Sequence, residues 1–270
     1  MGLAYVHGYN ERERERLHDQ AGALVTLLHH DTAYPPNAVV LEAGCGVGAQ
    51  TVTLARNSPR AHFVSVDISE ESLGAAERNA AAAGLKNVEF MRADIFHLPF
   101  PRAAFDHVFL CFVLEHLADP LRALRALRDV LKPTGTITVI EGDHGSTYFH
   151  PDDAAARDAV RCLVDLQRMA GGNGLIGRAL YPLFVAAGFA EVAVSPRMVY
   201  VDASKPELVD SFTKKTFTAM VEGVRDAAIA ARMATPEGFD AGVRALYRTA
   251  EADGVFCYTF FKGVARQARG

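Results

Sequence analysis

The sequence has no apolar run of the roughly 18–20 residues that a membrane-spanning helix needs. Its first residues, Met1-Gly2-Leu3-Ala4-Tyr5, lead into a highly charged stretch, which is unlike a signal peptide. The four cysteines (Cys45, Cys111, Cys162 and Cys257) never have CxxC spacing. These absences predict a cytoplasmic protein with no membrane span, zinc site or disulfide framework.

Basic tracts are also missing, and the formal net charge is −4. A nucleic acid is therefore not expected as an obligate partner. None of the ten histidines has the spacing of metal ligands, so we expect no metal site. The length of 270 residues, half of them apolar, suits one large α/β domain with insertions or a domain plus a lid.

Short apolar runs alternate with amphipathic stretches through the first half of the chain. Strands are predicted at 39–42, 61–67, 87–93, 105–111 and 136–141. Helices are predicted at 8–30, at 48–57, from the capping Ser69 to Gly84, and at 119–131, the last followed by a turn at 132–135. Such alternation favours a parallel sheet with helices on both faces. His29 and His30 are expected at the polar end of the first helix.

After residue 150 the pattern becomes more helical. Helices are predicted at 152–170, 205–233 and 236–252, and two further strands at 189–201 and 255–264. We therefore expect a single domain over 1–270. Its predicted parts are an N-terminal helical cap segment (1–37), a cofactor-binding core (38–150), and a helical lid with the final strands on the acceptor side (151–270).

The most informative segment is Val39-Val40-Leu41-Glu42-Ala43-Gly44-Cys45-Gly46-Val47-Gly48, an apolar run that ends in an acid and three alternating glycines. A strand that turns sharply into a helix offers free N–H groups and a positive dipole end to a nucleotide-like ligand. With Ala49 and Asp67 the loop satisfies the dinucleotide pattern, so an NAD(P)-dependent oxidoreductase is one alternative. A tight turn without a ligand is another.

Residues before and after the glycines distinguish these alternatives. Glu42 would repel a pyrophosphate but can receive the ammonium of an amino-acid moiety. Asp94 followed by Ile95 can accept an adenine N6 hydrogen and pack the ring. The ordered set of segments is Leu41–Gly48, Val66-Asp67-Ile68-Ser69, Ala93-Asp94-Ile95, Leu114-Glu115-His116-Leu117 and Leu131-Lys132-Pro133-Thr134-Gly135.

Over residues 38–141 this set resembles class I S-adenosylmethionine-dependent methyltransferases of the ubiquinone/menaquinone-methylase-like, small-molecule type. Thr134 departs from the second glycine that many members carry there. The resemblance implies a Rossmann-like, seven-stranded, mostly parallel α/β sheet with a helical cap made by N-terminal and C-terminal-half insertions. It also implies S-adenosyl-L-methionine as cofactor and a small-molecule acceptor.

Carried over to this chain, the resemblance implies a set of cofactor-binding residues. Backbone contacts to the methionine part would come from Gly44, Cys45, Gly46 and Gly48, with Gln50 at its carboxylate. Asp67 would hold the ribose hydroxyls, with Ile68, Asp94 and Ile95 at the adenine, and Cys111 and Phe112 beside the sulfonium. From the N-terminal segment, Tyr9 and Gln20 would cover the methionine end.

Three residues are candidates for the chemistry. The segment Glu141-Gly142-Asp143-His144-Gly145-Ser146 follows the fifth strand and is predicted to be a loop. His144 would act as general base there, with Glu141 orienting it or binding a substrate cation, although a solvated loop explains the segment equally well. His116 is the third candidate, in a corner where a structural histidine is more common.

The sequence thus predicts methyl transfer to O, N or C of a small molecule. An RNA or protein methyltransferase and a non-catalytic cofactor-binding module stay open as alternatives, and so does a homo-oligomer.

Overall fold

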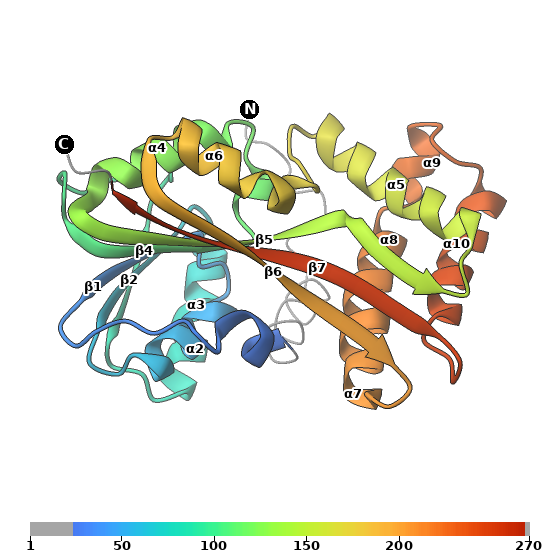
Figure 1. Cartoon of the computed structure of the whole chain (residues 1–270), viewed down its shortest axis with the longest axis horizontal. Coiled ribbons are helices and arrows are strands. Elements are labelled where there is room, and N and C mark those ends of the chain that lie inside the picture. The colour runs from blue at the N-terminus through green and yellow to red at the C-terminus, as the bar shows by residue number, and fades with distance from the viewer. Residues whose placement is uncertain (1–23, 268–270) are drawn as a thin grey trace. The chain divides into compact units, whose positions relative to one another are not determined.

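The structure, a computed structural model, describes residues 24–267 (Figure 1). Of the predicted helix 8–30, residues 24–29 are helical, and the remainder lies outside the described residues together with Tyr9 and Gln20. His29 is only 1% exposed, so it is a buried residue and not the exposed polar end of a helix.

In the described residues, the strands form one seven-stranded sheet in the order β3-β2-β1-β4-β5-β7-β6. The strands are β1 (Val39–Ala43), β2 (His62–Asp67), β3 (Val88–Arg92), β4 (Phe105–Cys111), β5 (Leu131–His150), β6 (Phe189–Asp202) and β7 (Val255–Gln267). Four neighbouring pairs, from β3 to β5, are parallel. Figure 1 draws β7 in the opposite direction to β5. The predicted Rossmann-like, mostly parallel sheet is confirmed.

The helices follow the strands as the sequence predicts, with several additions in the second half. They are α2 (Ala49–Asn57), α3 (Glu70–Ala82), η1 (Leu114–His116), α4 (Pro120–Val130), α5 (Ala154–Met169), η2 (Ile176–Ala179), α6 (Leu180–Ala186), α7 (Pro206–Leu208), η3 (Val209–Thr218), α8 (Ala219–Gly223), α9 (Arg225–Ala230) and α10 (Pro236–Arg248). Caps fix several beginnings: Ser69 Oγ accepts the Ser72 N–H, and Asp119 Oδ1 accepts the Arg122 N–H.

The chain divides into two compact units. Of the described residues, the glycine-loop unit comprises 28–141, 176–196 and 261–267, and the aromatic unit comprises 24–27, 142–175 and 197–260. Strands β5, β6 and β7 each contribute residues to both units. The predicted parts 1–37, 38–150 and 151–270 follow chain order instead and stay a prediction.

Within the glycine-loop unit, helices cover both faces of the sheet. Figure 1 shows α4 and α6 on one side of the strands and α2 and α3 on the other. Helix α4 buries Leu124 and Leu127 completely, and in the same core Leu41, Val108 and Ile137 from the central strands are also fully buried. This packing fixes the positions at which β1, β2 and β4 end, and the candidate site is built at those ends.

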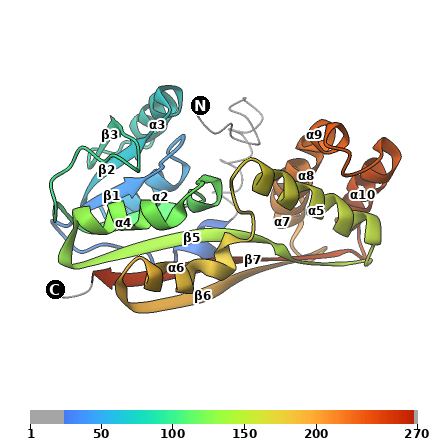
Figure 2. The same ribbon diagram turned by 90° about the horizontal axis from the view of Figure 1, so that it is seen from above.

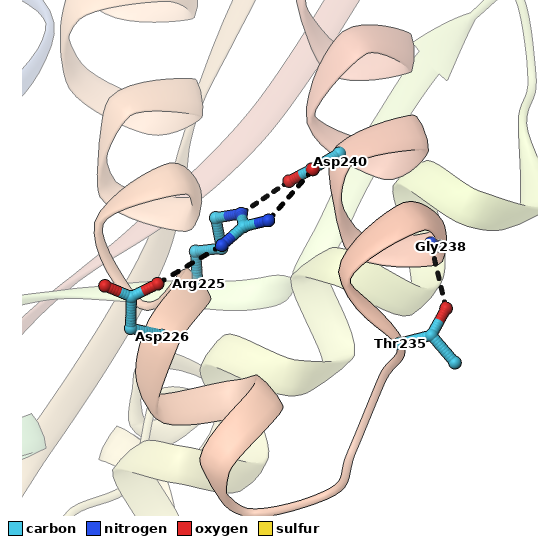
Figure 3. Close-up of polar contacts among 5 residues, drawn as sticks. All are labelled: Arg225, Asp226, Thr235, Gly238 and Asp240. Atoms are coloured by element: carbon cyan, nitrogen blue, oxygen red, sulfur yellow. Dashed lines mark hydrogen bonds and ion pairs between the residues drawn. The ribbon is translucent and has the colours of Figure 1, made fainter.

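Within the aromatic unit, α5 and α10 lie side by side (Figure 2). Gly242 allows this, since a Cβ there would lie 2.4 Å from the Ala155 carbonyl oxygen. Helix α10 begins at its Thr235 cap, whose hydroxyl accepts the Gly238 N–H (Figure 3). Arg225 and Asp240 join α9 to α10 through two parallel hydrogen bonds, also shown in Figure 3.

Strand β5 is longer than predicted at both ends. It starts at Leu131, so the predicted turn at 132–135 is wrong. Between the pairs Phe105↔Leu131 and His107↔Thr136, β4 advances by two residues (107 − 105) and β5 by five (136 − 131). The extra residues are therefore accommodated as an irregularity within a strand, where Lys132 Nζ binds Asp106 Oδ1 at 2.7 Å.

The loop predicted after Glu141, at 142–146, is also wrong, because these residues continue β5. Its glycines suggested a loop, but a Cβ at Gly142 would lie 2.3 Å from the Tyr258 hydroxyl oxygen. Gly142 therefore allows the Tyr258 hydroxyl to approach the backbone of β5 closely. No local pattern could reveal this, since Tyr258 lies 116 residues further along the chain (258 − 142).

The predicted helix 205–233 is interrupted. It contains α7, the π-helix η3, α8 and α9. Within η3 the Thr216 hydroxyl donates to the Ser211 carbonyl oxygen, five residues earlier, at 2.7 Å. A threonine hydroxyl that competes for backbone carbonyls helps to explain why the regular α-helical spacing is lost. The sequence also did not predict the short helices η2 and α6.

Candidate functional site

The loop between β1 and α2 turns on three glycines with left-handed backbone. Gly44, Gly46 and Gly48 have φ angles of 75°, 53° and 78°, which other residues adopt at a cost. The loop is tied to β2, because the N–H groups of Gly44 and Cys45 both donate to the Val66 carbonyl oxygen at 2.8 and 3.0 Å. The backbone therefore holds its conformation through its own hydrogen bonds.

The three glycines differ in what surrounds them. A Cβ at Gly44 would lie 2.5 Å from Val113 Cγ2, and one at Gly48 would lie 3.0 Å from Ala76 Cα. At Gly46, no described atom would lie within 4 Å of an added Cβ. Two of the glycines thus permit close packing, and Gly46 borders space that no described residue fills.

Asp67, at the carboxyl end of β2, lies directly against the loop. Its Oδ2 accepts the Gly46 N–H at 2.8 Å, and its Oδ1 accepts the Ser69 N–H at 2.9 Å. Each carboxylate oxygen can accept a second hydrogen bond. The position therefore suits a group that fixes the loop and still accepts hydrogen bonds from a pair of hydroxyls.

Glu42, which precedes the loop, is only 2% exposed. Its Oε2 accepts hydrogen bonds from the hydroxyls of Thr51 at 2.7 Å and Ser65 at 2.6 Å. Burial raises the pKa of Glu42 to about 7, although both hydroxyls oppose the shift. Glu42 therefore links β1, β2 and α2 beneath the loop, and its charge varies near neutral pH.

The carboxyl ends of β2 and β3 carry the residues expected at the adenine. Ile68 is 59% exposed, so its apolar side chain is accessible to a flat ring. Asp94 accepts the Phe96 N–H at 2.9 Å and pairs with His97 Nδ1 at 2.9 Å. Although burial acts to raise the pKa of Asp94, these hydrogen bonds lower it overall. Ile95 packs on the core.

Gln50, expected at the donor's carboxylate, has a partner that the sequence did not reveal. Its Oε1 accepts a hydrogen bond from His29 Nε2 at 2.6 Å. Burial lowers the pKa of His29 to about 4, so the ring is neutral at pH 7, while its Nδ1 is buried without a partner among residues 24–267. His29 thus holds the Gln50 oxygen and leaves the amide N–H₂ as the group that can donate to an anion.

The end of β4 turns sharply. Phe112 has a φ of 58°, a strained value for an aromatic residue, and Cys111 is half-buried. Burial and the neighbouring carboxylates raise the pKa of Cys111 well above its usual range, so the thiol is not a nucleophile at neutral pH. Strained backbone of this kind is common at functional sites.

The three residues proposed for the chemistry lie in different settings. Glu141 is fully buried in the glycine-loop unit and accepts the N–H groups of Val113 and Leu114. His116 lies on η1, with its Nε2 3.5 Å from Glu115 Oε1. The structure brings Glu141 together with the end of β4 and the turn that leads to His116.

His144 belongs to the aromatic unit and is 4% exposed. Its Nδ1 lies 2.9 Å from the Tyr258 hydroxyl and its Nε2 lies 3.4 Å from Gln167 Nε2. Since an amide nitrogen only donates, these contacts suit a ring that is protonated on Nδ1. Phe217 packs edge-on against the imidazole. His144 is thus a buried residue within a strand, in a set of contacts that the sequence did not predict.

Among residues 24–267, no group of three or more His, Cys, Asp or Glu side chains is arranged to hold a metal ion. The same residues include no helix that is both long and apolar enough to span a bilayer.

A family of methyltransferase domains matches residues 35–178, more than half of the chain. The chain belongs to this methyltransferase family. The matched range contains the glycine loop, Asp67, Asp94, the β4 turn and Glu141. The membership of a methyltransferase family predicted from the sequence is confirmed.

Relatives and solved structures agree with this. The chain is 35% identical over 192 residues to an uncharacterized 37.1 kDa protein of transposon Tn4556 from Streptomyces fradiae. This match covers 70% of this chain and 54% of that protein. It is 38% identical over 102 residues to the demethylmenaquinone methyltransferase of Thermus thermophilus. This match covers 38% of this chain and 46% of that enzyme. The chain thus spans about half the length of the curated relatives that it matches.

Two solved structures show the same fold at low identity. The [4+2]-cyclase SpnF is 22% identical with a TM-score of 0.56, over 93% of this chain and 82% of that one. Phosphoethanolamine N-methyltransferase 2 of Haemonchus contortus, solved with phosphomonomethylethanolamine and S-adenosylhomocysteine, is 15% identical with a TM-score of 0.57, over 93% of this chain and 53% of that one. The class I fold is therefore confirmed, and since one neighbour is named a cyclase, the fold alone does not define the reaction.

Proposed function

We propose that the protein is an S-adenosylmethionine-dependent methyltransferase that acts on a small organic molecule. The observation that carries the proposal is the glycine loop, in which Gly46 borders open space while Asp67 holds the Gly46 N–H. Membership of the methyltransferase family supports the same reaction. A cytoplasmic location and a possible homo-oligomer remain part of this proposal.

The polar residues around the loop fit this donor. Asp67 retains acceptor capacity for the two ribose hydroxyls, and Ile68 offers an exposed apolar side chain to the adenine. His29 leaves the Gln50 amide N–H₂ to meet a carboxylate. Glu42 in front of the loop disfavours a pyrophosphate when it is charged. A dinucleotide is therefore the less suitable ligand.

S-adenosylmethionine supplies a methyl group bound to a sulfonium, and transfer of this methyl group to the acceptor leaves a neutral thioether. The protein must therefore align the acceptor and exclude water, and alignment contributes at most about 7–11 kcal/mol to a reaction barrier. In this proposal Cys111 and Phe112 form the apolar wall at the end of β4, where the buried thiol stays protonated. An acceptor that must lose a proton would also require a general base, for which His144 and His116 remain the candidates.

The acceptor is proposed to be a small molecule rather than RNA or protein. The formal net charge is −4, and the chain has no basic tract of the kind that nucleic acid recognition requires. Methyl transfer to an RNA or a protein stays the alternative, and a panel of small acceptors tests the choice between them.

Calorimetry tests the donor. Wild-type protein is titrated separately with S-adenosylhomocysteine and with NAD(H), and we expect binding only of the former. Binding of NAD(H) alone would reject the proposal in favour of an oxidoreductase. Formation of S-adenosylhomocysteine from S-adenosylmethionine in the presence of small acceptors then tests the transfer itself.

A matched pair of aspartates locates the site. Asp67→Ala should weaken S-adenosylhomocysteine binding about 100-fold, because hydrogen bonds to a charged group contribute about 1.5–3 kcal/mol each. The control is Asp106→Ala at the start of β4, where the carboxylate accepts the Val39 N–H and the Lys132 ammonium. This substitution removes similar contacts at the amino end of a strand, whereas Asp67 lies at a carboxyl end, so affinity for S-adenosylhomocysteine should not change.

A further inference from the structure

Glu141 is buried in the core, where an ionisable side chain is unusual. The side chain is fully buried, and its Oε1 accepts the N–H groups of Val113 at 3.0 Å and Leu114 at 2.7 Å. Its Oε2 is also buried, without a hydrogen-bond partner in the part of the chain that the structure describes. The hydrogen bonds of the Glu141 side chain are thus made to backbone groups, to which the Glu115 backbone also contributes.

The backbone that Glu141 holds is strained. Phe112, directly before these two N–H groups, has a φ of 58° and donates its own N–H to the Ile140 carbonyl oxygen at 2.9 Å. Left-handed backbone at a bulky residue costs about 1–3 kcal/mol and persists only where surrounding contacts enforce it. Because Ile140 and Glu141 are consecutive in the middle of β5, that part of the strand supplies these contacts.

The same turn packs against the glycine loop. A Cβ at Gly44 would lie 2.5 Å from Val113 Cγ2, so the valine side chain lies directly on Gly44. A shift of the turn by a fraction of an ångström would therefore either press on the loop or uncover it. The contacts therefore run from the middle of β5 to the turn after β4, and from that turn to the loop after β1.

Electrostatics around Glu141 disfavour a charged side chain. Burial first, and then the neighbouring Glu115 carboxylate, raise the pKa of Glu141 well above its usual range, although the Leu114 and Val113 N–H groups oppose the shift. The other titratable groups nearby are Cys111, whose thiol is neutral, and His116, which lies beside Glu115. Such surroundings disfavour the charged form of a buried carboxyl.

We propose that Glu141 is a positioning residue. Its acceptor oxygen holds the turn Phe112–Leu114 and thereby keeps the Val113 side chain packed against Gly44 of the glycine loop. Shape and hydrogen bonding, not a negative charge, perform this task, so Glu141 is not the general base. The effect on the turn is independent of the ligand, whereas the effect on donor binding rests on the proposed function.

Two substitutions at the same position separate geometry from charge. Glu141→Gln keeps an acceptor oxygen at the same reach and cannot ionise. Glu141→Asp keeps the acid but is one methylene shorter, so it cannot reach both N–H groups as the glutamate does. A residue that works by charge is replaced better by aspartate, and one that works by geometry is replaced better by glutamine.

The first measurement is hydrogen exchange at the Val113 and Leu114 amides in the ligand-free protein. We expect Glu141→Gln to exchange as the wild type does, and Glu141→Asp to exchange about tenfold faster, because at least one hydrogen bond is lost. The second is calorimetry with S-adenosylhomocysteine, in which Glu141→Asp should bind about tenfold more weakly and Glu141→Gln as well as wild type. The pH profile of methyl transfer should be unchanged in Glu141→Gln.

Val113→Ala provides a variant that leaves Glu141 in place. It should keep the slow exchange at Leu114 but weaken binding of S-adenosylhomocysteine, and unchanged affinity would overturn the link to the loop. Fast exchange in Glu141→Gln, or activity in Glu141→Asp but not in Glu141→Gln, would overturn the proposal itself. If the exchange results hold while wild-type protein does not bind S-adenosylhomocysteine, the turn is positioned as proposed and the proposed function fails.

Discussion

Three acids at the site in the glycine-loop unit and His144 in the aromatic unit are held by different kinds of contact. In the first, Asp67, Asp94 and Glu141 each accept backbone N–H groups from turns at strand ends. In the second, the His144 side chain contacts other side chains, namely the Tyr258 hydroxyl and the Gln167 amide. Carboxylates that hold backbone produce fixed turns, whereas pairs of side chains depend on the packing around them.

The difference also lies in sequence distance. Asp67 reaches Gly46 across 21 residues and Glu141 reaches Val113 across 28, each within neighbouring strand–helix units. His144 reaches Tyr258 across 114 residues. The family match covers residues 35–178 and so includes His144 but not Tyr258. We therefore expect substitutions in the glycine-loop unit to affect donor binding, and those in the aromatic unit to affect stability first.

The largest expected effect is at Glu42. Its pKa is about 7 in the folded protein against an ordinary 4.5, so the folded state binds a proton more tightly between these pH values. Stability from this source is fully present below about pH 4.5 and is lost as the pH rises through 7, on the order of 3 kcal/mol in total. Urea unfolding of Glu42→Gln at pH 5 to 8 should show this slope removed.

His29 provides the matched control for that slope. Its pKa is about 4 in the folded protein against an ordinary 6.5, so its contribution is present above 6.5 and is lost as the pH falls toward 4. His29→Gln should therefore change the acid side of the profile and leave the slope near pH 7 intact. Identical profiles for wild type and Glu42→Gln would show that burial does not shift the Glu42 pKa.

Substitutions at Gly48 and Gly46 should distinguish a glycine needed for packing from one that borders the ligand. Gly48→Ala places a Cβ 3.0 Å from Ala76 Cα at a φ of 78°, and we expect it to cost roughly 2 kcal/mol of unfolding free energy. Gly46→Ala faces open space and should cost about 1 kcal/mol. It should nevertheless weaken S-adenosylhomocysteine binding by about tenfold. Denaturation and calorimetry measure both, and the reverse ranking in affinity would place the ligand elsewhere.

In the aromatic unit, Tyr258→Phe removes the hydroxyl that lies 2.9 Å from His144 Nδ1. Loss of a buried hydrogen bond should lower the unfolding free energy by about 1–2 kcal/mol. Tyr247→Phe is the control, since that hydroxyl binds Glu222 on the exposed surface and should contribute little. Equal losses in the two variants would mean that the His144–Tyr258 contact does not stabilise the unit. Donor-product affinity should not change in either variant.

The smallest effect is expected at the Arg225–Asp240 pair of Figure 3. Hydrogen bonds from Arg225 lower the pKa of Asp240, so the pair stabilises the protein above the ordinary aspartate pKa and loses this effect as the pH falls through the lowered value. Asp240→Asn should give a small decrease in thermal midpoint at pH 7, because the pair is exposed and screened by salt. A large decrease that persists in 1 M salt would contradict this.

Local patterns were sufficient to predict much of the fold. The strands at 39–43, 62–67 and 105–111 were predicted within a residue or two, because buried parallel strands are short apolar runs between turn residues. Ser69 was correctly predicted to cap α3, since a cap is defined by residues only three positions apart. The acids at the ends of β2 and β3 were found in the same way.

Other features depended on contacts between distant residues. His29 was expected at a polar helix end, but Gln50 and Phe109 bury it. The segment around His144 was predicted to be a loop because it contains glycines and acids, yet Gly142 provides the space for the Tyr258 hydroxyl. In each case the partner lies more than 20 residues away, beyond the reach of a local pattern.

The sequence by itself determined the family and the alternation of strands and helices in the first half of the chain, because the glycine loop, the strand-end acids and the caps are short motifs whose geometry is local. Only the tertiary structure decided what Glu141 touches. Its carboxyl lies beside the turn after β4 because β4 and β5 pair in parallel, with Cys111 opposite Ile140. Register between strands is set by the whole core, and no segment of the chain encodes it alone.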